Sequence, residues 1–254
     1  MVLFLKILWY YLWIAPHILL GIILFVMAQR RLLRSFPIFF LYTAVEVLQF
    51  AVLFGIFLSD RHFGGDYERL FSGGMAVSSA LRFGVVYEVF SHLFADYPAL
   101  TETGKMLFRG VTILLLLACI AVAVVVPGKS IDLLMLATNT LDRTVSFLQC
   151  GLLLSVFIFS GYFALSLRSR AFGIALGLGT YASVQMATSA VLLYVGSTTN
   201  RLPNFVTMAA YHCCVLIWLW YLMMPERKPK YPSKALPEYD LEIWNQELQR
   251  MLQR

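Results

Sequence analysis

Long apolar stretches separated by short polar segments make up most of the chain. A helix needs about 20 predominantly apolar residues to cross the hydrocarbon core of a bilayer. Stretches of that length or longer predict seven membrane-spanning helices, at about 5–27, 36–58, 70–95, 107–126, 131–167, 171–195 and 203–224. The pattern therefore predicts an all-α integral membrane protein, a seven-helix bundle whose transmembrane domain covers residues 1–225.

The fifth of these stretches is longer than one span requires. Its first third is polar and includes Asp142 and Arg143, whereas the remainder is apolar. We expect either one long helix that projects beyond the outer leaflet or a short interfacial helix followed by a span.

A polar tail, residues 226–254, follows the seventh stretch. Leu241, Trp244, Leu248 and Met251 recur at helical spacing and predict a short cytoplasmic amphipathic helix at about 238–252. Acidic residues outnumber basic ones there, so the helix does not have the composition of a basic lipid anchor. We expect it to dock on the bundle or to bind a protein partner.

The amino-acid composition also indicates a chain that is surrounded by lipid. Hydrophobic residues make up 60% and charged residues 13%, whereas soluble domains carry about 25% charged residues. The net charge of +6 comes from short basic clusters between apolar stretches. This distribution is typical of topology signals, so we expect membrane lipid and not nucleic acid as a partner.

The loop charges also predict an orientation, because Lys and Arg concentrate in cytoplasmic loops. Eleven basic residues fall on one side of the seven spans and four on the other. The N-terminus is therefore expected outside and the C-terminus in the cytoplasm, in the inner membrane of a bacterium. The eleven are Arg30, Arg31, Arg34, Lys105, Arg109, Arg168, Arg170, Arg227, Lys228, Lys230 and Lys234; the four are Arg61, Arg69, Lys129 and Arg201.

Several ionisable and amide side chains interrupt the apolar stretches. Such a group costs about 2.5–3.5 kcal/mol or more at the bilayer centre and usually marks a site or an internal pair. Helix depths, counted at 1.5 Å per residue, place four of these groups in one layer near the midplane. The predicted ligand-binding or polar-core residues are His17, Glu46, Arg82 and His212 in that layer, with Gln49, Glu88, Gln149 and Gln185 nearby.

Two interpretations of this polar layer remain open. It is either a ligand pocket or proton relay, or a buried Glu46–Arg82 ion pair with hydrogen-bonded histidines that only orients helices, because buried polar groups need partners in either case.

A metal site is a weaker candidate. Glu88 and His92 are four residues apart, so they share a helix face, and with His17, Glu46 and His212 they could supply N and O ligands. The chain contains no H-x-x-x-H or H-E-x-x-H sequence, and no cofactor is assigned.

Glycines near the start of the sixth stretch, Gly173, Gly177 and Gly179, form a G-x-x-x-G-x-G sequence. In an apolar helix, small residues at this spacing predict close packing against a neighbouring helix.

No catalytic sequence signature names an activity. The first hypothesis is therefore a receptor-like or sensory protein that binds a small or lipidic ligand in the polar layer. A transporter or proton-relay protein, a structural subunit of a larger membrane complex, and an intramembrane metalloenzyme are the alternatives.

Overall fold

The computed structural model describes residues 2–58, 64–95, 142, 144–154, 168–195 and 201–225, with isolated positions at 102, 104–106, 109–110, 113, 249 and 251. Every regular element in these parts is a helix. The bounds are α1 (Val2–Gln29), the 3₁₀ turn η1 (Leu32–Arg34), α2 (Pro37–Leu58), α3 (Gly64–Leu93), α6 (Arg170–Val195) and α7 (Arg201–Met223). Residues 144–154 are also helical.

These bounds confirm the all-helical prediction for the described residues. Within the described parts of the chain, four helices are long and apolar enough to cross a membrane, over Lys6–Gln29, Pro37–Ile56, Leu70–Leu93 and Leu202–Met223. Helix α6, with 26 residues, is not among them. The predicted span at 107–126, much of 131–167 and nearly all of the predicted tail helix lie outside the described residues.

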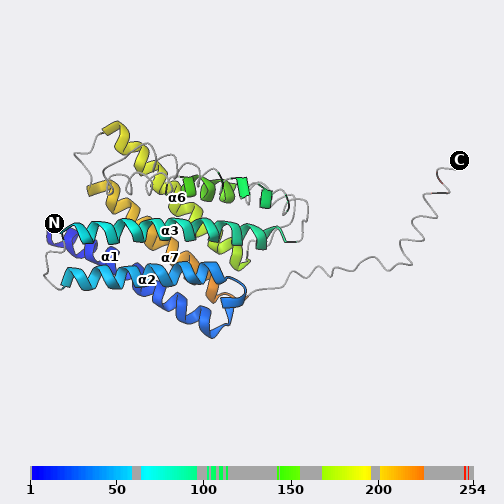
Figure 1. The fold of residues 1–254 in the computed structure, drawn as a ribbon, viewed down its shortest axis with the longest axis horizontal. Coiled ribbons are helices and arrows are strands. Elements are labelled where there is room, and N and C mark those ends of the chain that lie inside the picture. The colour runs from blue at the N-terminus through cyan, green and yellow to red at the C-terminus, as the bar shows by residue number, and fades with distance from the viewer. Residues whose placement is uncertain are drawn as a thin grey trace.

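The helices form a closed ring. Helix α1 packs against α2 and α7, α2 packs against α3, α3 against α6, and α6 against α7. Figure 1 shows that helices adjacent in sequence run in opposite directions within each of the groups α1–α3 and α6–α7. Every described helix of the ring therefore touches two others, and side chains from all five can meet in the interior.

Helices α1 and α7 are parallel, and their C-terminal ends are joined. The Arg30 Nη1 donates hydrogen bonds to the backbone carbonyl oxygens of Leu222 (3.1 Å) and Met223 (2.9 Å). The last carbonyl groups of a helix have no partner within the helix and carry partial negative charge. Arg30, which directly follows α1, thus supplies hydrogen-bond donors to the free carbonyl groups at the end of α7.

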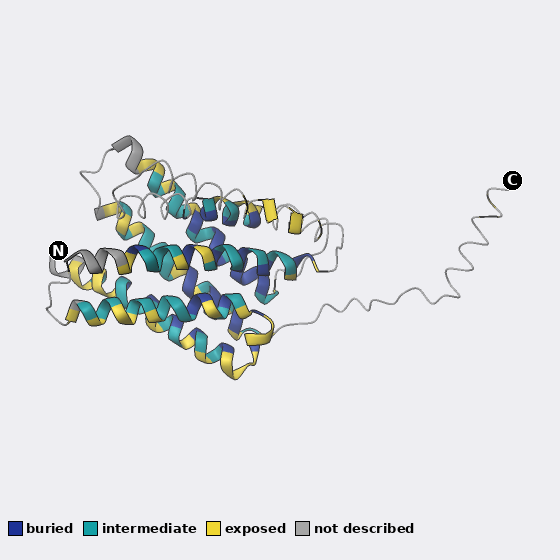
Figure 2. Cartoon of the chain, in the orientation of Figure 1, coloured by how far each residue is buried: buried dark blue, intermediate teal, exposed yellow. Residues whose placement is uncertain are grey.

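The solid core fills the half of the bundle that contains these two C-terminal ends. Buried positions gather on the inward helix faces there (Figure 2). Trp218 on α7 is at the centre: its Nε1 donates to the carbonyl of Ile174 at 3.2 Å, and its ring meets Phe39 edge-on at 5.1 Å. The apolar members include Leu20, Ile23, Met27, Phe39, Val85, Val86, Val89, Phe94, Ile174, Leu178, Trp218 and Leu222.

The glycines of α6 lie at close helix contacts. A Cβ atom on Gly173 would meet the ring of Tyr221, and one on Gly177 would meet the indole of Trp218, both on α7. One on Gly179 would meet Leu153 of the helical segment 144–154. The predicted close packing at this sequence is confirmed.

Large apolar side chains also cover the outside of the bundle. Examples on α1, α2, α3 and α7 are Phe25, Leu48, Val77 and Trp220, in that order. A soluble monomer rarely exposes contiguous apolar surface of this kind. The outer surface is therefore suited to lipid.

Candidate functional site

A cavity of about 280 Å³ lies in the other half of the bundle, between α1, α2, α3, α6 and α7. Four of the polar residues predicted from the sequence line it: His17, Glu46, Gln49 and Arg82. Three of them, His17, Glu46 and Arg82, belong to the layer expected from helix depth, and whether they bind a ligand stays a prediction.

Aromatic side chains form much of the remaining wall. They are Trp13, Tyr42, Phe50, Phe71, Tyr181 and Tyr211. The sequence interpretation did not include them, because single aromatic residues in an apolar stretch do not stand out from lipid-facing ones. Only their depth in each helix, compared with the depth of Glu46, could have identified them as wall residues.

The orientation of His17 is set by contacts on both sides of its ring. Its Nδ1 lies 2.8 Å from the Trp13 carbonyl oxygen, which can only accept, so Nδ1 is the protonated nitrogen. The imidazole also stacks on Phe50, with ring centroids 4.0 Å apart and an angle of 12° between the planes. A neutral His17 would therefore present Nε2 as an acceptor.

Two polar atoms at the cavity residues have no hydrogen-bond partner among the described residues. They are the hydroxyl of Tyr211 and Nε of Arg82, and both are inaccessible to solvent. Buried polar groups in proteins are normally paired, with protein or with a bound molecule.

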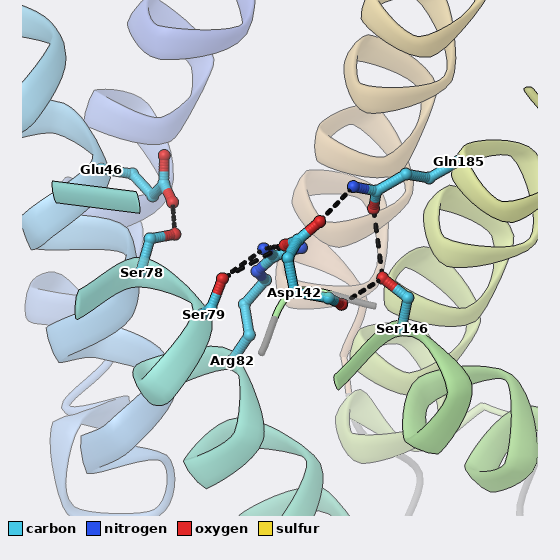
Figure 3. A network of polar contacts seen from close by, with 7 residues as sticks. All are labelled: Glu46, Ser78, Ser79, Arg82, Asp142, Ser146 and Gln185. Carbon is cyan, nitrogen blue, oxygen red and sulfur yellow. Dashed lines mark hydrogen bonds and ion pairs between the residues drawn. The ribbon is translucent and has the colours of Figure 1, made fainter. Parts of the chain in front are cut away.

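Arg82 forms an ion pair with Asp142, as Figure 3 shows. Its Nη2 also donates to Ser79 Oγ at 3.0 Å, and Ser79 Oγ donates to Asp142 Oδ1 at 3.1 Å. Both charged residues are buried, with exposed fractions of 6% and 8%. A buried guanidinium needs a carboxylate partner, and here that partner is Asp142.

The same carboxylate connects to α6. Gln185 Nε2 donates to Asp142 Oδ2 at 2.6 Å, while Ser146 Oγ donates to the Asp142 backbone carbonyl at 2.9 Å. Gln185 is thus part of the polar core as predicted, but on the side of Asp142 and not on the cavity wall.

The proposed Glu46–Arg82 ion pair is wrong for the described residues. Glu46 instead accepts a hydrogen bond from the hydroxyl of Ser78. In Figure 3 this contact is separate from the Arg82–Asp142 group. Two carboxylates were available to Arg82, and charge alone could not select between them.

Asp142, in the polar start of the fifth stretch, is buried in the bundle, whereas the expectation that this start projects beyond the outer leaflet stays a prediction. Its burial between α3 and α6 places this residue in the interior, at the level of Arg82. The ion pair with Arg82 accounts for this buried position, because an Arg82 without a carboxylate partner inside the bundle would be far more costly.

Glu88 has a structural role at a helix end. Its two carboxylate oxygens accept hydrogen bonds from the backbone N–H groups of Ile38 (3.0 Å) and Phe39 (2.9 Å), at the start of α2. A negative charge at a helix N-terminus satisfies free N–H groups and interacts favourably with the helix dipole. Glu88 is therefore a cap for α2 and does not line the cavity.

The other two candidate histidines, His92 and His212, lie elsewhere. His92 is bonded through Nδ1 to the backbone carbonyl of Glu88 at 2.9 Å. His212 lies in the contact between α1 and α7, with its Nε2 3.4 Å from the hydroxyl of Tyr11. The prediction that His212 shares a site with Glu46 is wrong, since it does not line the cavity.

Gln149 is fully buried in the helical segment 144–154. Both of its amide atoms lack a partner within the described parts of the chain.

The suggested metal ligands are not brought together. No group of three or more His, Cys, Asp or Glu side chains suited to a metal ion occurs among the described residues. The carboxylate of Glu88 is directed at α2, and His17 and His212 have different neighbours.

Comparison with known proteins does not assign a relationship. No protein-family model, curated protein or solved structure matches the chain.

Proposed function

We propose that the chain is a receptor-type, seven-helix membrane protein that binds a small organic ligand in the cavity beside Glu46. The observation that supports this proposal best is the composition of the cavity wall. A carboxylate, a guanidinium and several aromatic rings from five helices surround one space. Ligand pockets are commonly apolar and aromatic with a few oriented polar groups.

We propose that the N-terminus is outside, the C-terminus is in the cytoplasm and the number of spans is seven. The parallel arrangement of α1 and α7, joined at their C-terminal ends by Arg30, supports an odd number of crossings. The concentration of basic residues beyond those same ends supports the orientation. A bacterial inner membrane as the location stays a prediction.

The position of the cavity favours a receptor over a transporter. In the proposed orientation the cavity belongs to the outer half, and the solid core fills the inner half. Tyr42 lines the cavity and packs against the buried Trp218, with ring centroids 6.2 Å apart. A ligand that enters from outside would therefore stop above packed side chains.

Helix α7 offers a route for reporting occupancy. Tyr211 lines the cavity and Trp218 lies in the core. Near the end of the helix, the carbonyl oxygen of Leu222 accepts a hydrogen bond from Arg30. We propose that a ligand at Tyr211 shifts α7 and thereby changes the cytoplasmic tail.

A matched pair of variants tests ligand binding. Met75 lines the cavity, and Met75→Trp should fill it, whereas Val77 on the same helix is 50% exposed and Val77→Trp adds the same group outside. Thermal unfolding in detergent would be measured with a chemically diverse library of small molecules. A ligand that binds the folded state raises the unfolding temperature.

We expect at least one chemical class to stabilise the wild type and Val77→Trp but not Met75→Trp. Stabilisation that is absent throughout, or equal in all three proteins, would overturn the proposal.

A further inference from the structure

Among the described side chains at the cavity, the two carboxylates and the guanidinium are not matched one to one. The positive charge of Arg82 is matched by Asp142, and its Nη2 is already bonded to Asp142 and Ser79. Glu46 has one contact among the described side chains, the neutral hydroxyl of Ser78. Glu46 is therefore the carboxylate on the cavity wall that has no ion-pair partner among the described residues.

The aromatic wall is suited to a positive charge. Trp, Tyr and Phe rings attract cations through the negative faces of their π systems. Trp13 on α1 and Phe50 on α2 line the cavity, and Tyr211 on α7 adds a hydroxyl that has no hydrogen-bond partner among the described residues. The rings of Trp13 and Phe50 pack edge to face, with centroids 5.7 Å apart and an angle of 77° between the planes. These two rings therefore support each other across α1 and α2.

We infer that the ligand of this cavity is a small organic cation whose ammonium group pairs with Glu46 and whose apolar part packs on the aromatic rings. This inference rests on the proposed function. An anion would meet the Glu46 carboxylate with Arg82 already neutralised. A neutral ligand would leave Glu46 as an unpaired charge inside the bundle, which is costly.

The size of the cavity limits the ligand further. A volume of about 280 Å³ is just below the range of about 300–1,000 Å³ that is common for ligand pockets. It suits a small amine or a lipid head group and does not suit an entire lipid.

Three probes with one carbon skeleton separate charge from shape: 3-phenylpropylammonium, 3-phenylpropanol and 3-phenylpropionate. Their affinities would be measured by calorimetry in dodecyl maltoside, with subtraction of the signal from empty micelles. The proteins are the wild type, Glu46→Gln, which keeps the shape of the side chain, and the cavity-filled Met75→Trp.

We expect the wild type to bind the ammonium probe about tenfold or more tightly than the alcohol, because the cation gains both the carboxylate and the rings. Glu46→Gln should lose that preference and bind the two probes alike. Dihexanoyl phosphatidylethanolamine, added as a competitor, then distinguishes a lipid head group from a free amine. Competition assigns the ammonium to a lipid, and absence of competition assigns it to a free amine.

The inference is overturned if the wild type binds the alcohol or the carboxylate at least as tightly as the ammonium probe. It is also overturned if the preference for the cation persists in Glu46→Gln, or if no probe distinguishes the wild type from Met75→Trp. The proposed function has its own test in the library comparison. A non-cationic class that stabilises the wild type but not Met75→Trp would retain the function and reject only the cation.

Discussion

Arg82 on α3 forms an ion pair inside the bundle with Asp142, which precedes the helical segment 144–154. Removing one member of a buried ion pair strands the other charge and typically costs about 3–5 kcal/mol. Arg82→Gln and Asp142→Asn should each lower the free energy of unfolding by roughly this amount. The double variant should lose clearly less than the two losses added together.

The control for this cycle is Glu46. Glu46→Gln removes a carboxylate that bonds to Ser78 and lies outside the ion pair, so its coupling energy with Arg82→Gln should be the smaller of the two. Chemical unfolding in detergent measures all of these values. Strict additivity of Arg82→Gln and Asp142→Asn would show that the two residues do not meet.

Glu88 should matter for stability and not for ligand binding. Glu88→Gln removes the charge that the first N–H groups of α2 require, and we expect a loss of about 1–2 kcal/mol. Hydrogen exchange at Ile38 or Phe39 should accelerate, because the glutamine amide keeps only one of the two oxygens that accept from these N–H groups. An unchanged exchange rate at these two amides would contradict the capping role.

Two glycine substitutions should differ in their effect on stability. In Gly177→Ala the new methyl group meets the Trp218 indole and lies 3.2 Å from the Cys214 carbonyl oxygen. Overpacking of this kind costs about 1–3 kcal/mol. In Gly74→Ala it meets only the flexible amide of Gln49, and alanine is the better helix former by roughly 0.5–1 kcal/mol.

Gly74→Ala should therefore leave stability nearly unchanged but displace Gln49 at the cavity wall and alter ligand affinity. Thermal unfolding with and without a cavity ligand checks both variants. Equal destabilisation by the two substitutions would mean that the contacts of α6 with α7 are not closer than those of α2 with α3.

Reporter fusions test the topology. Reporters placed after Met27, Met106 or Leu167 should give cytoplasmic signals, and those after Asp60 or Asn200 should give exterior signals, as the positive-inside rule requires. The experiment needs an alkaline phosphatase series and a fluorescent protein series, because the two reporters are active on opposite sides. A cytoplasmic signal for the Asp60 fusion would reverse the proposed orientation.

Apolar length and helix depth could be read from the sequence, but rotation about each helix axis could not. The bounds of α2 and α7 agree with their predicted stretches to within two residues. Glu46 and His212 were placed at similar depths, yet Glu46 lines the cavity and His212 faces Tyr11. In lipid, the outer face of a helix is as apolar as its inner face, so the sequence pattern carries little information about direction.

The partners of the buried charges were unpredictable for a related reason. Glu88 lies on a spanning helix, and its acceptor role became visible only once the start of α2 was placed beside it. Asp142 was judged by the polarity of its neighbours in sequence, whereas its position depends on Arg82, 60 residues earlier. Contacts between distant parts of the chain depend on packing, which the pattern of a single stretch does not contain.

The hydrogen bonds from Arg30 to the end of α7 also set an order of assembly during biosynthesis. Leu222 follows Arg30 by 192 residues, which at about 5–20 residues per second means a delay of roughly 10–40 s between the two. Throughout this interval α1 is already made, but the neighbour on one of its sides does not yet exist. The ring can close only when the last helix leaves the translocation machinery. Substitutions at Arg30 should therefore act on the packing of α1 against α7 and not on the helices that are made between them.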